Sequence, residues 1–86
     1  MINQKDNPAA WAMLVHGLDD ASEHLAQLVR ELTTKEGYGE EEFRIDLGHV
    51  YAHLNRAWNS RNITADLTDE EWEQCTEFPK DLDPVG

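Results

Sequence analysis

The sequence predicts an all-α protein: a long antiparallel helical hairpin, a short third helix packed on it and an extended C-terminal tail. Apolar residues recur at intervals of three and four along residues 8–35 and again along residues 40–61, which is the pattern of amphipathic helices. A glycine-containing segment separates the two stretches, and a helix-capping motif follows them at residues 68–71. No segment shows the sustained alternation of polar and apolar residues that indicates a strand.

The first predicted helix, about residues 8–35, begins with Asn7 as its capping residue and Pro8 at its first helical position. It would make about eight turns. Its apolar stripe consists of Trp11, Leu14, Leu18, Ala21, Leu25, Leu28 and Leu32, and it is widened by Val15 and Val29. These residues share one side of a helix, so we expect them to face the core.

The second predicted helix, about residues 40–61, follows a short connection in which Gly37 favours the end of the first helix. Three consecutive glutamates, residues 40–42, fall in its first turn, where the helix dipole favours negative charge. Its apolar stripe consists of Phe43, Leu47, Val50, Tyr51, Leu54, Ala57 and Trp58. A short connection between two long helices predicts an antiparallel hairpin.

The third predicted helix begins at Asp69, because Thr68 and Glu71 form the pattern of a capping box. Leu67 and Trp72 stand at the positions of the hydrophobic staple that often accompanies this box. The helix must end by Phe78, since the next residue is a proline. We expect one small domain over residues 1–86, in which residues 1–6 and 79–86 are peripheral.

The width of the two apolar stripes predicts self-association. A hairpin covers only part of each stripe, and the short third helix can cover only part of what remains. A second copy of the chain would complete the core as a four-helix assembly. We therefore expect a homodimer.

Charge is the clearest feature of the composition. The 86 residues include 18 acidic and 7 basic side chains, giving a net charge of −11 with neutral histidines. Residues 62–86 alone carry eight acidic side chains against Lys80. Such a chain repels nucleic acid and anionic lipid, so we expect no direct nucleic-acid or membrane partner and favour a basic protein partner.

The cellular compartment of the protein is indicated only indirectly. No apolar run approaches the roughly 20 residues that cross a bilayer, and the first residues lack the basic-then-apolar pattern of a signal peptide. The single cysteine, Cys75, cannot form an internal disulfide. We expect a cytoplasmic protein.

Three histidines form the only metal-like constellation in the sequence. His49 and His53 are four residues apart on the second helix, with Asp46 on the same flank. In an antiparallel hairpin, His24 falls level with them, with Asp20 nearby. One interpretation, which we favour, is a solvated boundary between the apolar and polar faces; the other is a metal site, for example for zinc, with His24, His49 and His53 as ligands.

No catalytic motif is present. The chain has no phosphate-binding glycine loop, nucleophile-elbow serine or paired-cysteine motif, and acidic neighbours make Cys75 a poor nucleophile. We therefore expect a non-enzymatic protein–protein interaction module without a cofactor. Two alternatives remain: an inhibitor of a basic protein, acting as a nucleic-acid mimic or as an immunity or antitoxin partner, and a metal-binding protein that uses the histidine cluster.

Overall fold

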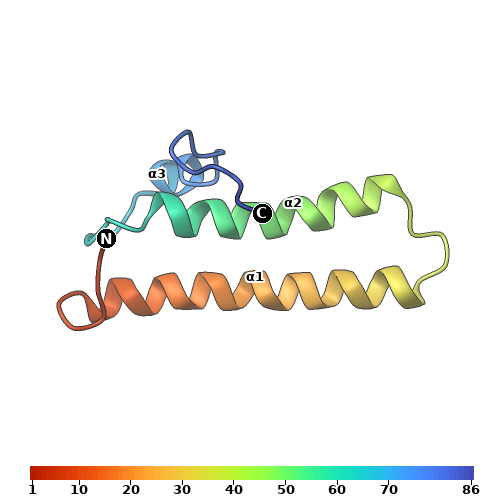
Figure 1. The fold of residues 1–86 in the computed structure, drawn as a ribbon, viewed down its shortest axis with the longest axis horizontal. Helices are drawn as coiled ribbons and strands as arrows, with labels where there is room; N and C mark the ends of the chain where they lie inside the picture. Colours follow the sequence, from red (N-terminus) through yellow and green to blue (C-terminus); the bar gives the residue numbers. More distant parts are fainter.

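The computed structural model describes residues 1–86 and confirms the all-α hairpin (Figure 1). Helix α1 spans Pro8–Thr34, α2 spans Glu40–Asn59 and α3 spans Asp69–Gln74. Helices α1 and α2 run antiparallel and pack against each other along their length. The predicted bounds are close, although α2 ends before residue 61 and α3 is only six residues long.

The start of α1 differs from the predicted cap. Pro8 is the first helical residue, but the Asn7 side chain makes no capping hydrogen bond; its Oδ1 instead accepts the Asn3 N–H at 3.4 Å. The N-terminal segment was also expected to be peripheral. The structure instead buries Ile2, whose N–H donates to the Arg61 carbonyl at 2.8 Å. An apolar side chain and one backbone bond thus tie this segment to the end of the hairpin.

The turn between α1 and α2 is held by local hydrogen bonds. Gly37 has a φ of 74°, a left-handed conformation that glycine adopts without steric cost. The Gly39 N–H donates to Glu42 Oε2 at 3.0 Å, so a first-turn glutamate satisfies the backbone at the start of α2. The Tyr38 hydroxyl donates to Asp46 Oδ2 at 2.6 Å and fastens the turn to α2.

The capping box that begins α3 is confirmed. The Glu71 N–H donates to Thr68 Oγ1 at 3.2 Å, and the Thr68 N–H donates to Glu71 Oε1 at 3.2 Å. After α3 the chain crosses the outer surface of α2. The Asn59 side chain donates to the Cys75 and Glu77 carbonyls at 2.7 and 2.9 Å, and Asn55 Nδ2 donates to the Thr76 carbonyl at 2.9 Å.

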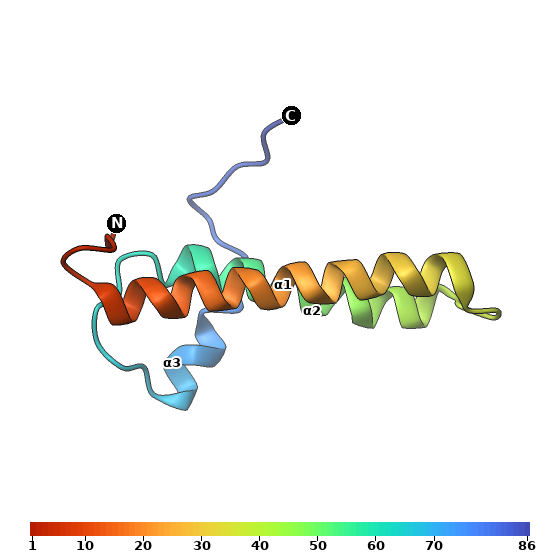
Figure 2. The ribbon, with the colours of Figure 1, turned by 90° about the horizontal axis from the view of Figure 1, so that it is seen from below.

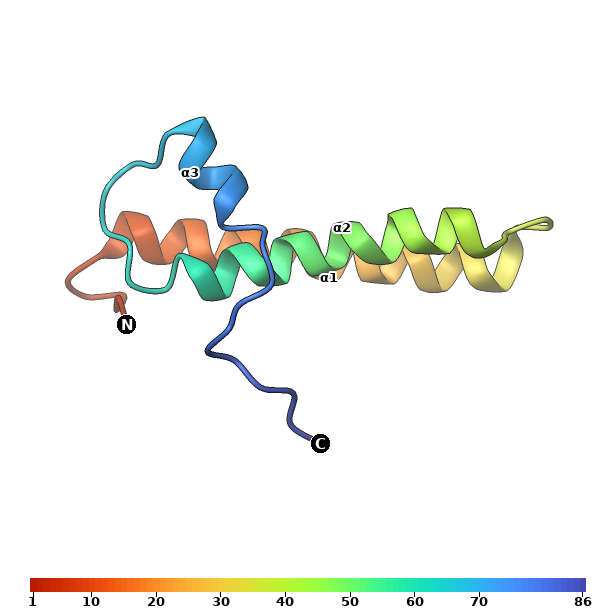
Figure 3. The same cartoon turned by 90° about the horizontal axis from the view of Figure 1, so that it is seen from above.

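Beyond this crossing, hydrogen bonds hold the C-terminal tail on α2. Asp81 accepts the Trp58 indole N–H at 2.8 Å and the Arg61 guanidinium at 2.8 Å. The Arg61 guanidinium also lies 3.9 Å from the centre of the Trp58 ring. Phe78 packs edge-on against Tyr51. As a result, α3 lies on one side of the hairpin and the tail leaves on the other, as Figures 2 and 3 show.

The core of this monomer is thin. Only six residues are buried: Ile2, Ala21, Leu28, Val50, Asn55 and Cys75. The accessible surface is 6818 Å², whereas a compact protein of 9.9 kDa would expose about 5,200 Å². The radius of gyration is 14.9 Å, against about 12 Å for a compact chain of 86 residues. The chain therefore leaves uncovered much of the surface that folded domains usually bury.

The hairpin has two chemically different sides. Ala21 and Leu28 point from α1 toward α2 and are buried. At 100° per residue, His24 lies about 40° from Leu28 in one direction and Leu25 about 60° in the other. On α2, His53 and Leu54 diverge in the same way from buried Val50. We call the two sides the histidine side and the apolar side.

Candidate functional site

The histidine cluster joins α1 to α2. The ring centroids of His24 and His49 are 5.7 Å apart, with the planes at 72°. Those of His24 and His53 are 5.0 Å apart, with the planes at 23°. The predicted juxtaposition of these three residues is confirmed, because the antiparallel hairpin places His24 between the two histidines of α2.

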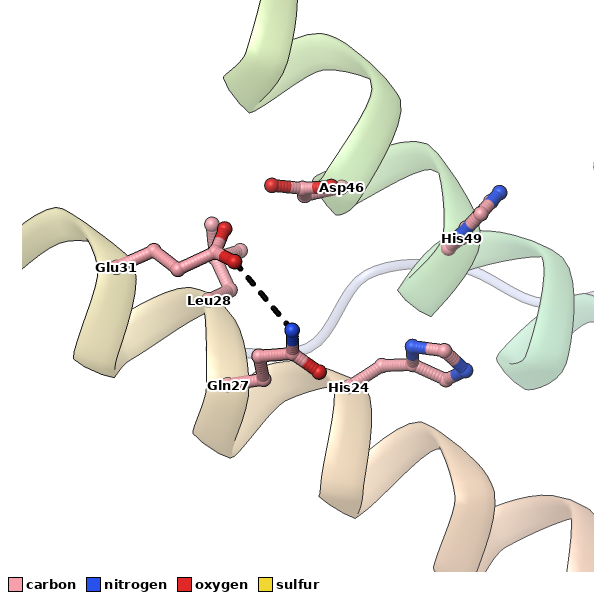
Figure 4. Close-up of a pocket in the computed structure, with 6 residues that line it drawn as sticks. All are labelled: His24, Gln27, Leu28, Glu31, Asp46 and His49. Atoms are coloured by element: carbon pink, nitrogen blue, oxygen red, sulfur yellow. Dashed lines mark hydrogen bonds between the residues drawn. The ribbon is translucent and has the colours of Figure 1, made fainter. Parts of the chain in front are cut away.

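A polar hollow of about 190 Å³ lies beside this cluster (Figure 4). It is lined by His24, Gln27, Leu28, Glu31, Asp46 and His49. The Asp46 and Glu31 carboxylates point toward each other from opposite helices (Figure 4), and Gln27 Nε2 donates to Glu31 Oε1 at 3.3 Å. Glu31 was not among the predicted site residues, although it follows His24 by seven residues and therefore shares its side of α1.

Hydrogen bonding and burial shift the pKa values of Asp46, Tyr38 and His53 in this site. The Tyr38 hydroxyl bond holds the pKa of Asp46 below its usual range, and burial together with that bond raises the pKa of Tyr38. Burial lowers the pKa of His53, and nearby His24 and Arg56 lower it further. At neutral pH, Asp46 is therefore an anion and His53 a neutral imidazole.

The side chains do not form a closed metal site in their present positions. No group of three His, Cys, Asp or Glu side chains converges closely enough to hold a metal ion. His24 and His53 are stacked rather than pointed at a common atom, and Asp20 pairs with exposed His16 at 3.5 Å. His24 and His49 are exposed and His53 is half-buried, as expected for residues at a solvated boundary.

The surroundings of Cys75 and Trp72 indicate packing roles. Cys75 is buried, and burial and the Glu71 charge raise the pKa of its thiol, so little thiolate forms at neutral pH. The effect of the acidic surroundings has the sign expected from the sequence, and the acidic side chain responsible is that of Glu71. Trp72 lies 5.3 Å from the Arg56 guanidinium. It lines an apolar hollow of about 490 Å³ between α1 and the loop that precedes α3.

The apolar side is the second candidate site. On α1 its exposed members are Val15, Leu18, Leu25, Val29 and Leu32, which are 44–54% exposed. On α2 it continues through Phe43, Tyr51 and Leu54, and the tail adds Phe78, which packs against Tyr51. At 100° per residue, the charged side chains of α1 all point away from the centre of this surface. A row of uncharged, exposed aliphatic side chains about 25 Å long is typical of an interaction surface.

The chain matches no protein-family model, and neither the curated proteins nor the solved structures contain a match to it. None of the three helices combines the length and the apolar character needed to cross a bilayer. The two candidate sites are therefore interpreted from their own chemistry.

Proposed function

We propose that this chain is a non-catalytic protein–protein interaction module that assembles as a homodimer through its apolar side. The observation that carries the proposal is the row of half-exposed aliphatic residues along α1, represented by Leu25 at 46% and Val29 at 54% exposure. Each such side chain gains about 25 cal/mol for every Å² of apolar surface removed from water. A second copy offers the same surface and would cover this row.

The dimensions of the apolar side fit a stable interface. Helix α1, with its 27 residues, is about 40 Å long, and two adjacent helices are about 20 Å wide. The hairpin face therefore measures about 800 Å² per copy before the part of α2 under the tail is subtracted, which approaches the area that each partner buries in a typical specific complex. The thin core of the monomer supports the same assembly, because the chain alone exposes more surface than a compact protein of its mass.

Charge favours the apolar side as the place of contact. A chain with a net charge of −11 repels its own copies through most of its surface. The α1 part of the apolar side carries no acid at its centre, whereas Glu31, Asp46 and the first turn of α3 lie on the other side of the hairpin. The acidic side chains of the histidine side and of α3 then stay outside the dimer and are free to attract a basic protein.

Sedimentation equilibrium tests the assembly. We expect a dimer at micromolar concentration, whereas a 9.9 kDa species at every loading would contradict the proposal. Leu25→Asp should give a folded monomer, because it places a charge in the middle of the apolar row. Gln27→Asp is the matched control, since it adds the same charge on the histidine side and should leave the dimer intact.

An inhibitor of a basic protein is a narrower version of the same proposal. The net charge of −11 supports a nucleic-acid mimic or an immunity or antitoxin partner. Affinity capture from native lysate, with identification of the retained protein, distinguishes the two: a basic nucleic-acid-binding protein or nuclease favours the inhibitor, and any other partner favours a general module.

A transition-metal site is the second candidate function. It is favoured by the position of His24, which lies 5.7 Å from His49 and 5.0 Å from His53 between ring centroids, beside the carboxylate of Asp46. Imidazole and carboxylate are ligands that zinc accepts. Binding would require the rings to rotate, which the exposed side chains of His24 and His49 permit.

A further inference from the structure

The apolar row of α1 has the same spacing from either end. On the apolar side, successive positions are Val15, Leu18, Ser22, Leu25, Val29 and Leu32. The intervals between them are three, four, three, four and three residues. The sequence of intervals is thus unchanged when α1 is read backwards, and its midpoint lies between residues 23 and 24.

We propose that two copies pack through α1 with the two helices antiparallel and the two-fold axis between residues 23 and 24. In this arrangement, a residue of one copy lies opposite the residue of the other copy for which the two residue numbers add up to 47. Val15 packs against Leu32 of the second copy, Leu18 against Val29 and Ser22 against Leu25. This inference rests on the proposed dimer and specifies its geometry.

The helical geometry supports this alignment. Alternating intervals of three and four residues are the seam of a coiled coil, in which two helices cross at a shallow angle of about 20° and keep their apolar rows in contact. A two-fold axis perpendicular to α1 makes the contact closed, so assembly stops at two copies. The small side chain of Ser22 lies near the axis, where the two helices approach each other closely.

The charges at the edge of the row distinguish the antiparallel from the parallel arrangement. Asp19 and Arg30 lie on the edge of α1 that faces away from α2. In the antiparallel dimer, Asp19 of one copy lies within about 3 Å, measured along the helix axis, of Arg30 of the other. In a parallel two-fold dimer, the edges of the two copies that carry Asp19 and Arg30 would lie on opposite sides of the contact, so these charges would not meet. Only the antiparallel arrangement pairs opposite charges at this edge.

The rest of the fold leaves α1 itself uncovered on this side, because α3 is on the opposite side of the hairpin (Figures 2 and 3). The tail contacts Tyr51 and Trp58 of α2 and then projects from the apolar side (Figures 2 and 3), so its last residues must move aside when the second copy binds.

Disulfide trapping tests the alignment. In a Cys75→Ala background, Val15→Cys and Leu32→Cys are made separately and oxidised alone or as a mixture. We expect a cross-linked dimer only in the mixture, because the two copies of position 15 are about 26 Å apart in the antiparallel dimer. Cross-linking of Val15→Cys alone would show a parallel dimer and overturn the alignment. A dimer that persists in sedimentation but does not cross-link in the mixture would also overturn it.

A charge exchange gives a second test that leaves the apolar row intact. Asp19→Arg and Arg30→Asp should each weaken the dimer about fivefold, because each disturbs two symmetry-related pairs at the edge. The double variant should recover the wild-type affinity. Failure of the double variant to recover, with helicity unchanged, would contradict the alignment. If the wild-type chain is a monomer, the proposed function itself fails, and this outcome is distinct from a dimer with another alignment.

Discussion

The imidazole rings of His24 and His53 stack across the hairpin, with their centroids 5.0 Å apart and their planes 23° apart. This contact joins α1 to α2 on the side that carries Asp20, Asp46 and Arg56. Two protonated imidazoles at this distance would repel each other, and His53 is also partly withdrawn from water. The contact is therefore compatible with folding when His53 is neutral and opposes folding when it is charged.

The first prediction is a loss of stability on acidification. Because the pKa of His53 is lower in the folded chain than in the unfolded one, the unfolded state takes up its proton first as the pH falls below about 6.5. Stability from this residue is therefore full above that pH and declines below it. Denaturant titrations of His53→Gln between pH 7 and 5 should show a smaller decline than the wild type. His16→Gln removes an exposed imidazole elsewhere on α1 and is the matched control for the substitution itself.

The second prediction concerns metal. If the solvated-boundary interpretation is right, micromolar zinc leaves the melting temperature unchanged, and the double variant His49→Gln, His53→Gln folds and associates like the wild type. If His24, His49 and His53 bind an ion, zinc raises the melting temperature of the wild type only, and elemental analysis finds about one ion per site. The rise should disappear as the imidazoles protonate, between about pH 7 and 5.

Local signals in the sequence accounted for most of the fold. The apolar periodicity predicted α1 and α2, and Thr68 with Glu71 predicted the start of α3, because both depend on residues within one or two turns. The juxtaposition of His24 with His49 and His53 followed from the antiparallel arrangement of two helices. These features require only helix geometry and a short turn.

Features that depend on contacts between distant segments were not predicted. The burial of Ile2, the Asp81 clasp on Trp58 and Arg61, and the approach of Glu31 to Asp46 join parts of the chain whose relative positions periodicity does not specify. The missing side-chain cap at Asn7 has a local cause, since its Oδ1 is engaged by the Asn3 N–H. Residue preferences at helix ends indicate where a cap can form, but neighbouring donors decide whether it does.

The third prediction is that the α3 cap matters more than a surface charge. Thr68→Ala removes the oxygen that accepts the Glu71 N–H and should lower the free energy of unfolding by about 0.5–2 kcal/mol. Glu40→Gln changes an exposed residue and should alter it by about 0.5 kcal/mol or less. Urea titrations of both variants give the comparison. An equal or larger effect of Glu40→Gln would show that α3 contributes little to the stability of the chain.

The last prediction is that Asp81 holds the tail on α2. Its carboxylate accepts the Trp58 indole N–H and pairs with Arg61, and these bonds hold its pKa below the usual range. Asp81→Asn removes the negative charge that pairs with Arg61 and should loosen the tail. Trypsin should then cleave faster after Lys80, and the fluorescence of Trp58 should change. Asp83→Asn is the control, because Asp83 is two residues further along the exposed tail.

In the wild type, the tail should also be released on acidification. A carboxylate with a lowered pKa stabilises the folded state above its unfolded pKa, and this stabilisation is lost as the pH falls through the folded pKa. If Asp81→Asn and Asp83→Asn are cleaved at the wild-type rate, the tail is held by the Asn55 and Asn59 bonds further upstream rather than by Asp81.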